Sequence, residues 1–154
     1  MNTLEEEMLG RRQLGENAFS RYNFYEAESV GPDCAVYRLD IRPESLNPYG
    51  MVHGGAMYTM ADDASGAAAL SDGRYYVTQS GTLHFLQNQS RGIIRAAASV
   101  RHRGRTTCLV DVDITNEEGV LLATGEFTYF CVNRAFMEKR PREDAPPPPP
   151  GASD

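Results

Sequence analysis

The chain has 154 residues, of which 41% are hydrophobic and 23% are charged, a composition typical of one soluble globular domain with its own core. Its 15 Lys and Arg residues and 21 Asp and Glu residues give a net charge of −6, which argues against a nucleic-acid binder with a basic surface. No apolar run reaches the roughly 18 residues of a transmembrane helix, so we expect no membrane span.

The amino-terminal segment is acidic and lacks the long apolar stretch of a secretory signal. A T-x-x-E capping box and an apolar stripe predict a short helix over residues 3–14. The three cysteines, Cys34, Cys108 and Cys131, are odd in number, far apart and without metal-binding spacing. We therefore expect reduced thiols, no metal site and a cytoplasmic protein.

Two strands are predicted next, over 22–30 and 34–41, with a Gly-Pro-Asp turn between them. After a loop, an Ala- and Met-rich helix is predicted over 52–70. From residue 75 the apolar period changes to two, which predicts four long strands linked by hairpins over 75–86, 92–103, 106–115 and 120–132.

These elements predict an α+β fold in which an antiparallel sheet wraps around one long helix, because a helix that is apolar on nearly every side must be covered all round. We divide the chain into an N-terminal helical segment (1–20), the folded domain (21–135) and a charged, Pro-rich tail (136–154) that we expect to be disordered. The sheet edges and the helix surface left open favour pairing of two copies.

Two features of the long helix suggest chemistry. Its start, His53-Gly54-Gly55, offers unpaired backbone N–H groups and the positive end of the dipole, which suit a polarised carbonyl oxygen. Asp62, a candidate general base or nucleophile, shares a face with Gly55 and Thr59. Gly55 and Asp62 lie about 10 Å apart along the axis, so one reacting carbon reaches both only if two helices meet around a two-fold axis.

The segment 47–62 has the pattern N-x-x-G-x-x-H-G-G-x-x-x-x-x-x-D, formed by Asn47, Gly50, His53, Gly54, Gly55 and Asp62. It resembles the signature of hotdog-fold acyl-CoA thioesterases of the phenylacetate-degradation (PaaI-like) type, in the 4-hydroxybenzoyl-CoA thioesterase superfamily, and the similarity extends from about Val30 to Val132. The resemblance implies the hotdog fold, a homodimer or homotetramer with sites between subunits, and hydrolysis of an acyl-CoA to an acid and free CoA. CoA is then part of the substrate, and no cofactor is implied.

The resemblance also implies roles for single residues. Asp62 matches the base or nucleophile, and Gly55 the backbone donor that polarises the thioester carbonyl. Asn47 and His53 match polar groups near the carbonyl and the sulfur, and Thr78 a hydroxyl near the attacking water.

Five arginines lie between residues 91 and 105. In relatives the turn that matches Arg103-Gly104-Arg105 lies near the CoA phosphates, which suits the bidentate binding of phosphate by Arg; a solvated outer face is an equally good interpretation. Asp63 has no role implied by the resemblance, and either a surface or ion-paired position or a like-charge effect on the pKa of Asp62 fits it.

Two other functions compete with the thioesterase. A non-catalytic hotdog protein that binds acyl-CoA or another small ligand is disfavoured, because a binder has no need of a buried Asp62. A hotdog dehydratase or hydratase needs a different Asp/His or Glu/His arrangement. The acyl group and the choice between dimer and tetramer stay open.

Overall fold

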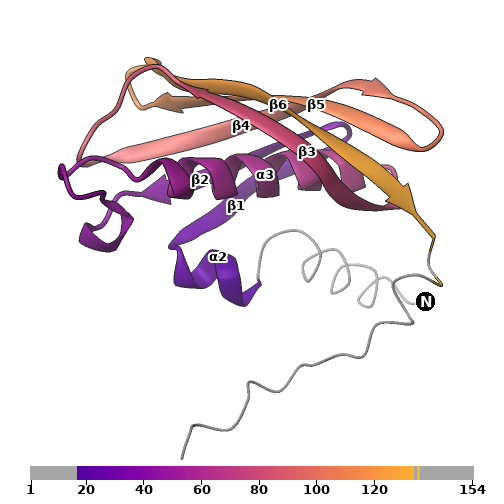
Figure 1. Cartoon of the computed structure of the whole chain (residues 1–154), viewed down its shortest axis with the longest axis horizontal. Coiled ribbons are helices and arrows are strands. Elements are labelled where there is room, and N and C mark those ends of the chain that lie inside the picture. The colour runs from indigo at the N-terminus through magenta and orange to yellow at the C-terminus, as the bar shows by residue number, and fades with distance from the viewer. Residues whose placement is uncertain (1–16, 134, 136–154) are drawn as a thin grey trace, which may run out of the picture.

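The computed structural model describes residues 17–133 and 135 (Figure 1). The predicted helix over 3–14 and the predicted tail over 136–154 lie outside the described residues. Within them, the order of elements is α2 (Ala18–Tyr22), β1 (Tyr25–Gly31), β2 (Cys34–Asp40), a short 3-10 turn η1 (Pro43–Ser45), α3 (Gly54–Leu70), β3 (Tyr75–Phe85), β4 (Ile93–Arg103), β5 (Thr107–Asn116) and β6 (Leu121–Val132).

The α+β hotdog architecture is confirmed. All six strands form one antiparallel sheet, and Figure 1 shows α3 running along the inside of its curve. The four long strands begin and end within a residue of their predicted bounds. The long helix begins at Gly54 rather than at residue 52, because Val52 forms an isolated bridge with Leu46 and His53 is the N-cap.

The predicted hairpin between the first two long strands is wrong. The strand order is β1-β2-β4-β5-β6-β3, so β3 pairs with β6, and β4 lies between β2 and β5. The link over 86–92 crosses the sheet instead of turning tightly. It is held to the segment before α3, because the Asn88 side chain donates to the Val52 carbonyl and the Val52 N–H donates to the Gln89 carbonyl.

The core forms between α3 and the inward-facing positions of the strands. One side of α3 is buried there, with Met57, Met60, Ala61, Ala64, Ser65, Ala67, Ala68 and Ala69. Along the other side, Gly55, Tyr58, Thr59, Asp62 and Gly66 keep part of their surface accessible. The face that the spacing assigned to Gly55 and Asp62 is therefore the open face of the helix within this chain.

No helix among residues 17–133 has the length and apolar character that crossing a membrane requires.

Candidate active site

Asp62 lies in the middle of α3 and is held by two hydroxyl donors. The Tyr129 hydroxyl on β6 shares its proton between Oδ1 at 2.7 Å and the Asp62 backbone carbonyl at 2.6 Å, and Thr78 on β3 donates to Oδ1 at 2.9 Å. Tyr129 is buried, and burial together with the charge of Asp62 raises the pKa of its phenol far above the usual range, so it stays a donor. The second carboxylate oxygen, Oδ2, has no hydrogen-bond partner among the described residues, so its lone pairs are available for a proton or a carbon atom.

The sheet register brings both donors to Asp62. Thr78 and Tyr129 are directly opposite partners in the β3–β6 ladder, so their side chains leave the sheet on the same face. A bulge follows Thr78, between it and Ser80. Because side chains alternate along a strand, the extra residue there turns Thr78 inward while Gly81 and Leu83, farther along, also face the core.

The start of α3 is capped by a side chain. His53 Nδ1 accepts a hydrogen bond from the Gly55 N–H at 2.8 Å, so the ring proton is assigned to Nε2. The predicted carbonyl-polarising amide of Gly55 thus already has a partner. The N–H of Gly54, the first helical residue, has no hydrogen-bond partner in the described part of the chain, as is usual for the first turn of a helix.

Asn47 stabilises the loop that leads to this helix. Its Oδ1 accepts from the N–H groups of Tyr49 at 2.9 Å and Met51 at 3.2 Å, and the Gly50 N–H donates to its backbone carbonyl. Gly50 has a φ of 77°, which favours glycine in this turn. The turn uses the carbonyl end of the Asn47 side chain, so its NH₂ group is the end that can reach a ligand.

Asp63, the second carboxylate of the pair, points toward β1, whereas Asp62 points toward β3 and β6. Tyr25 on β1 donates to its Oδ2 at 2.6 Å. Burial raises the pKa of Asp63 above its usual range; the Tyr25 hydrogen bond opposes this shift, and the neighbouring charge of Asp62 adds to it. Asp63 is therefore half-buried with a tyrosine partner, and not a fully solvated surface residue.

Both carboxylates border one cavity of about 140 Å³. It lies over the open face of α3, between the β1–β2 side of the sheet and the β3–β6 side, and is lined by Asn17, Tyr37, Asp62, Asp63, Gly66, Ala67, Leu70, Tyr76, Thr78 and Tyr129. A small group placed there would lie beside Asp62.

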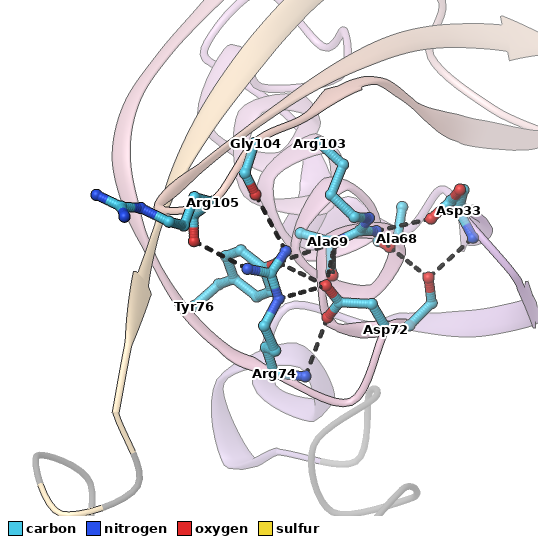
Figure 2. A network of polar contacts seen from close by, with 10 residues as sticks. Asp33, Ala68, Ala69, Asp72, Arg74, Tyr76, Arg103, Gly104 and Arg105 are labelled. Atoms are coloured by element: carbon cyan, nitrogen blue, oxygen red, sulfur yellow. Dashed lines mark hydrogen bonds and ion pairs between the residues drawn. The ribbon is translucent and has the colours of Figure 1, made fainter.

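Arg103, proposed from sequence as a CoA-phosphate contact, is instead directed into the protein (Figure 2). Its guanidinium pairs with Asp33 at 2.7 Å and Asp72 at 2.9 Å. It also donates to the Tyr76 hydroxyl and to the last carbonyls of α3, at Ala68 and Ala69. The side chain is only 19% exposed, so Arg103 clamps the end of α3 to β3 and the β1–β2 turn and has little capacity left for phosphate.

Gly104 and Arg105, the other two residues of the R-G-R turn, bind the protein through their backbone carbonyls instead. The carbonyls of Gly104 and Arg105 accept from the Arg74 guanidinium at 3.2 and 2.9 Å. Figure 2 shows the Arg105 side chain pointing away from this network, and it is exposed. The Arg105 guanidinium thus has no partner among the residues that the structure describes, and its contact with CoA stays a prediction.

Replacing Arg103 should destabilise the fold. We expect Arg103→Ala to lower the free energy of unfolding by about 3 kcal/mol, because the partly buried Asp72 and two helix carbonyls lose their donor. The matched variant Arg105→Ala removes only an exposed charge and should change stability little. Differential scanning calorimetry should show a Tm lower by roughly 6–12 °C for the first variant alone; equal shifts would contradict the clamp.

Two contact residues were not identified from sequence, Tyr129 and Tyr25, and Gly54 was named as part of the helix start but not as the donor. The alternation in "EFTYF" places Phe127 and Tyr129 on one face of β6, so an inward phenol was predictable. Its meeting with Asp62 was not, because the two are 67 residues apart and the pairing of β3 with β6 decides it.

Comparison with known proteins places the chain in a family. Residues 49–123 match the Thioesterase superfamily. The acyl-coenzyme A thioesterase PaaI of Escherichia coli is 33% identical over 112 residues, 67% of this chain and 80% of the relative.

Solved structures of thioesterases are also similar to this chain. A thioesterase protein of Streptococcus pneumoniae, solved with coenzyme A, is 34% identical with a TM-score of 0.67, covering 71% of this chain and 89% of that one. The same protein was also solved with an aspartate and, separately, a threonine replaced by alanine. The E. coli PaaI structure has a TM-score of 0.73 at 25% identity, covering 77% of this chain and 86% of that one.

Proposed function

The chain belongs to the thioesterase superfamily and is a thioester hydrolase, and we propose that its substrate is an acyl-CoA that is hydrolysed to a carboxylic acid and free CoA, with Asp62 as the reacting carboxylate. The observation behind this proposal is the arrangement at Asp62. Two hydroxyls hold Oδ1, which fixes the carboxylate, and within residues 17–133 Oδ2 has no hydrogen-bond partner beside a cavity.

In the proposed reaction, Asp62 Oδ2 takes a proton from water as the water oxygen attacks the thioester carbon. In the alternative route Oδ2 attacks that carbon itself, and water then hydrolyses the resulting mixed anhydride to the acid and restores the carboxylate. The carbonyl oxygen gains negative charge and receives a hydrogen bond from the start of α3. When the C–S bond breaks, the sulfur leaves with the electron pair and takes up a proton, which gives free CoA. Thr78 and Tyr129 keep the carboxylate in place throughout.

The start of α3 supplies the donor in this proposal. The Gly55 N–H is bonded to His53, whereas the Gly54 N–H has no partner in the part of the chain that the structure describes. Gly54 therefore offers the first hydrogen bond to the carbonyl oxygen, and Gly55 adds a second when His53 turns aside. The Asn47 NH₂ group and the His53 Nε2–H are further donors at the same end of the helix.

A further support comes from the pneumococcal thioesterase. Its two alanine substitutions, one of an aspartate and one of a threonine, lie 16 residues apart, the same separation as between Asp62 and Thr78, which are hydrogen-bonded here.

Release of free thiol across an acyl-CoA panel tests the proposed function. We expect thiol release from at least one acyl-CoA, and no release of acid from an oxygen ester of the same acid that lacks CoA. A binding protein would show tight association without thiol release. A hydratase would consume the double bond of an enoyl-CoA and release no thiol. Either result would overturn the proposal.

The active site is proposed to be shared between two subunits. Gly54 and Asp62 are separated by about 12 Å along one helix axis, too far for one thioester carbon. Strands β1 and β3 are the edges of the sheet, and exposed large apolar side chains occur on α3, β3, β6 and the link after β3, at Tyr58, Val77, Phe85, Leu86 and Phe130. Edges and apolar surface of this kind favour association with a second copy.

A mixing experiment tests the shared site. Take two inactive variants, Asp62→Asn and Gly54→Pro, and unfold, mix and refold them together. In a mixed dimer one site would combine both defects and the other none, so random assembly should restore about a quarter of wild-type activity. If every site is built within one chain, no activity returns even when mass spectrometry shows mixed dimers, and the shared geometry is excluded.

A further inference from the structure

A second cavity lies on the outer face of the sheet, at the start of β1, directly after α2 (Figure 1). Tyr25 and Leu39 are opposite partners that face the core, so the next pair, Glu26 and Arg38, leaves the sheet on the other side. The cavity is open to solvent and measures about 500 Å³, within the range of roughly 300–1,000 Å³ common for small-molecule sites. Among the described residues, none lines both this cavity and the one beside Asp62.

The arginines of this cavity differ from those that stabilise the fold. Four arginines elsewhere form an ion pair with a carboxylate: Arg74, Arg95, Arg101 and Arg103. Arg38 and Arg42 line the cavity and form no ion pair within residues 17–133. Glu26 lines it too, directly opposite Arg38 in the β1–β2 ladder, yet its carboxylate has no ion pair or hydrogen bond to another described residue. The cavity therefore presents charges of both signs that the fold does not use.

Two features of the cavity are unfavourable for the fold itself. Phe24 follows the C-cap of α2 and has a φ of 63°, a conformation in which glycine is usual and a bulky side chain is costly. Arg38 is directly opposite Arg95 in the β2–β4 ladder, and like charges so placed are destabilising. Residues kept against such local costs often serve a function.

Phe24 and Arg42 together form one wall of the cavity. The Arg42 guanidinium lies 4.8 Å from the centroid of the Phe24 ring, and 37% of Phe24 is exposed. A partly exposed ring of this kind packs well against a second aromatic ring. The guanidinium is held in place by the ring, which prepares it to donate to a carboxylate.

The charges of the cavity favour a ligand that carries both signs. A simple anion would meet Arg38 and Arg42 but would be repelled by Glu26, and a simple cation would be repelled by the two arginines. A molecule with one carboxylate and one ammonium group satisfies both sets. Arg21 and Asp40, one charge of each sign, also line the cavity and leave this balance unchanged.

We infer that this cavity binds a free aromatic α-amino acid. Its carboxylate lies between Arg38 and Arg42, its ammonium group donates to Glu26, and its ring packs on Phe24. This site is separate from the one around Asp62, and the inference holds whether or not the proposed hydrolysis is correct.

Isothermal titration calorimetry of the full chain with matched ligands tests the site. At least one of L-phenylalanine, L-tyrosine and L-tryptophan should bind with a Kd below about 1 mM. Three analogues of the ligand that binds, one without the ammonium group, one without the carboxylate and one without the ring, should each bind about tenfold more weakly or worse. For L-phenylalanine these are 3-phenylpropionate, phenethylamine and L-alanine. If no aromatic amino acid binds, or if removal of either charge leaves the Kd unchanged, the proposal is wrong.

Variants then locate the binding. Arg38→Gln should weaken binding of the amino acid and of the analogue without an ammonium group by about tenfold. Glu26→Gln should weaken only the amino acid, because that analogue brings no ammonium group to this position. Arg91→Gln is the matched control: Arg91 is exposed, lies outside this cavity and forms no ion pair with a described residue, so the same change of charge should leave the Kd unchanged. Equal effects of Arg38→Gln and Arg91→Gln would exclude the assigned site.

Phe24→Gly separates binding from stability. Glycine readily adopts the positive φ of this position, so Tm should not fall, whereas the Kd of the aromatic amino acid should rise by about tenfold. A lower Tm with unchanged binding would show that the ring serves the fold alone. Coenzyme A should not displace the amino acid, and displacement would overturn the assignment of a separate site.

Discussion

Asp62→Asn should lower kcat for acyl-CoA hydrolysis by about 10²–10⁴-fold, the usual cost of losing a catalytic base. Asparagine has the size of aspartate, and its amide oxygen can still accept from Tyr129 and Thr78, which hold Oδ1 in the wild type. What disappears is the second oxygen, since an NH₂ group can neither take a proton from water nor attack a carbon. Thiol-release kinetics measure the loss, and calorimetry should show a Tm close to that of the wild type.

Asp40→Asn is the matched control for this variant. Asp40 is an exposed carboxylate at the end of β2, so the same chemical change there should leave kcat unchanged. If Asp62→Asn keeps more than about a tenth of the wild-type kcat, Asp62 is not the catalytic base. A large loss of Tm would show instead that the carboxylate serves the fold.

The elements of the fold were predictable because the apolar pattern is strong. Alternation in 93–103 and 107–116 leaves no choice of face, and a one-residue slip would put Ile94 and Val112 in water. The order of the strands was not predictable in the same way. Local alternation says nothing about which strand lies next to β3, and the hydrogen bonds from Asn88 and to Gln89 that guide the crossover depend on Val52, far along the chain.

The same distinction applies to the candidate site. Asp62 and the helix start were predictable, because they depend on spacing along one helix. The hydrogen bond between the Gly55 N–H and the His53 side chain was not predictable. His53 takes the Gly55 N–H and leaves Gly54 as the unpaired donor, and nothing in the spacing distinguishes these two glycines.

Charge alone was a poor guide to the arginines. Arg103 and Arg105 are two residues apart in one turn, yet Arg103 is bound by two carboxylates and two helix carbonyls, whereas the Arg105 side chain points to solvent. The partners of Arg103 come from residues 33, 68, 69 and 72, so only the folded chain decides which arginine is free.

Gly54→Pro should lower kcat by about 10²–10³-fold, the cost of removing one oxyanion donor. Proline is favourable at the first position of a helix. It replaces the backbone N–H, which has no partner among the described residues, by the ring Cδ. His53, the residue before it, already has φ −64° and ψ 132°. This extended conformation is one that a residue before proline readily adopts. A Cβ atom at Gly54 would lie 3.4 Å from the Phe85 ring, at ordinary contact distance. The fold should therefore survive, and calorimetry checks this.

Gly54→Ala completes the experiment, because it adds the same Cβ atom and keeps the N–H. If the Gly54 N–H polarises the thioester carbonyl, the alanine variant keeps kcat within a few-fold of wild type and the proline variant does not. Equal losses in both variants would assign the effect to the added side chain at the Phe85 contact. Full activity in both would leave the Gly55 N–H, released from His53, as the donor at the start of α3. The pair of variants thus separates the backbone hydrogen bond from the space that the two glycines keep open, which no substitution at Asp62 can do.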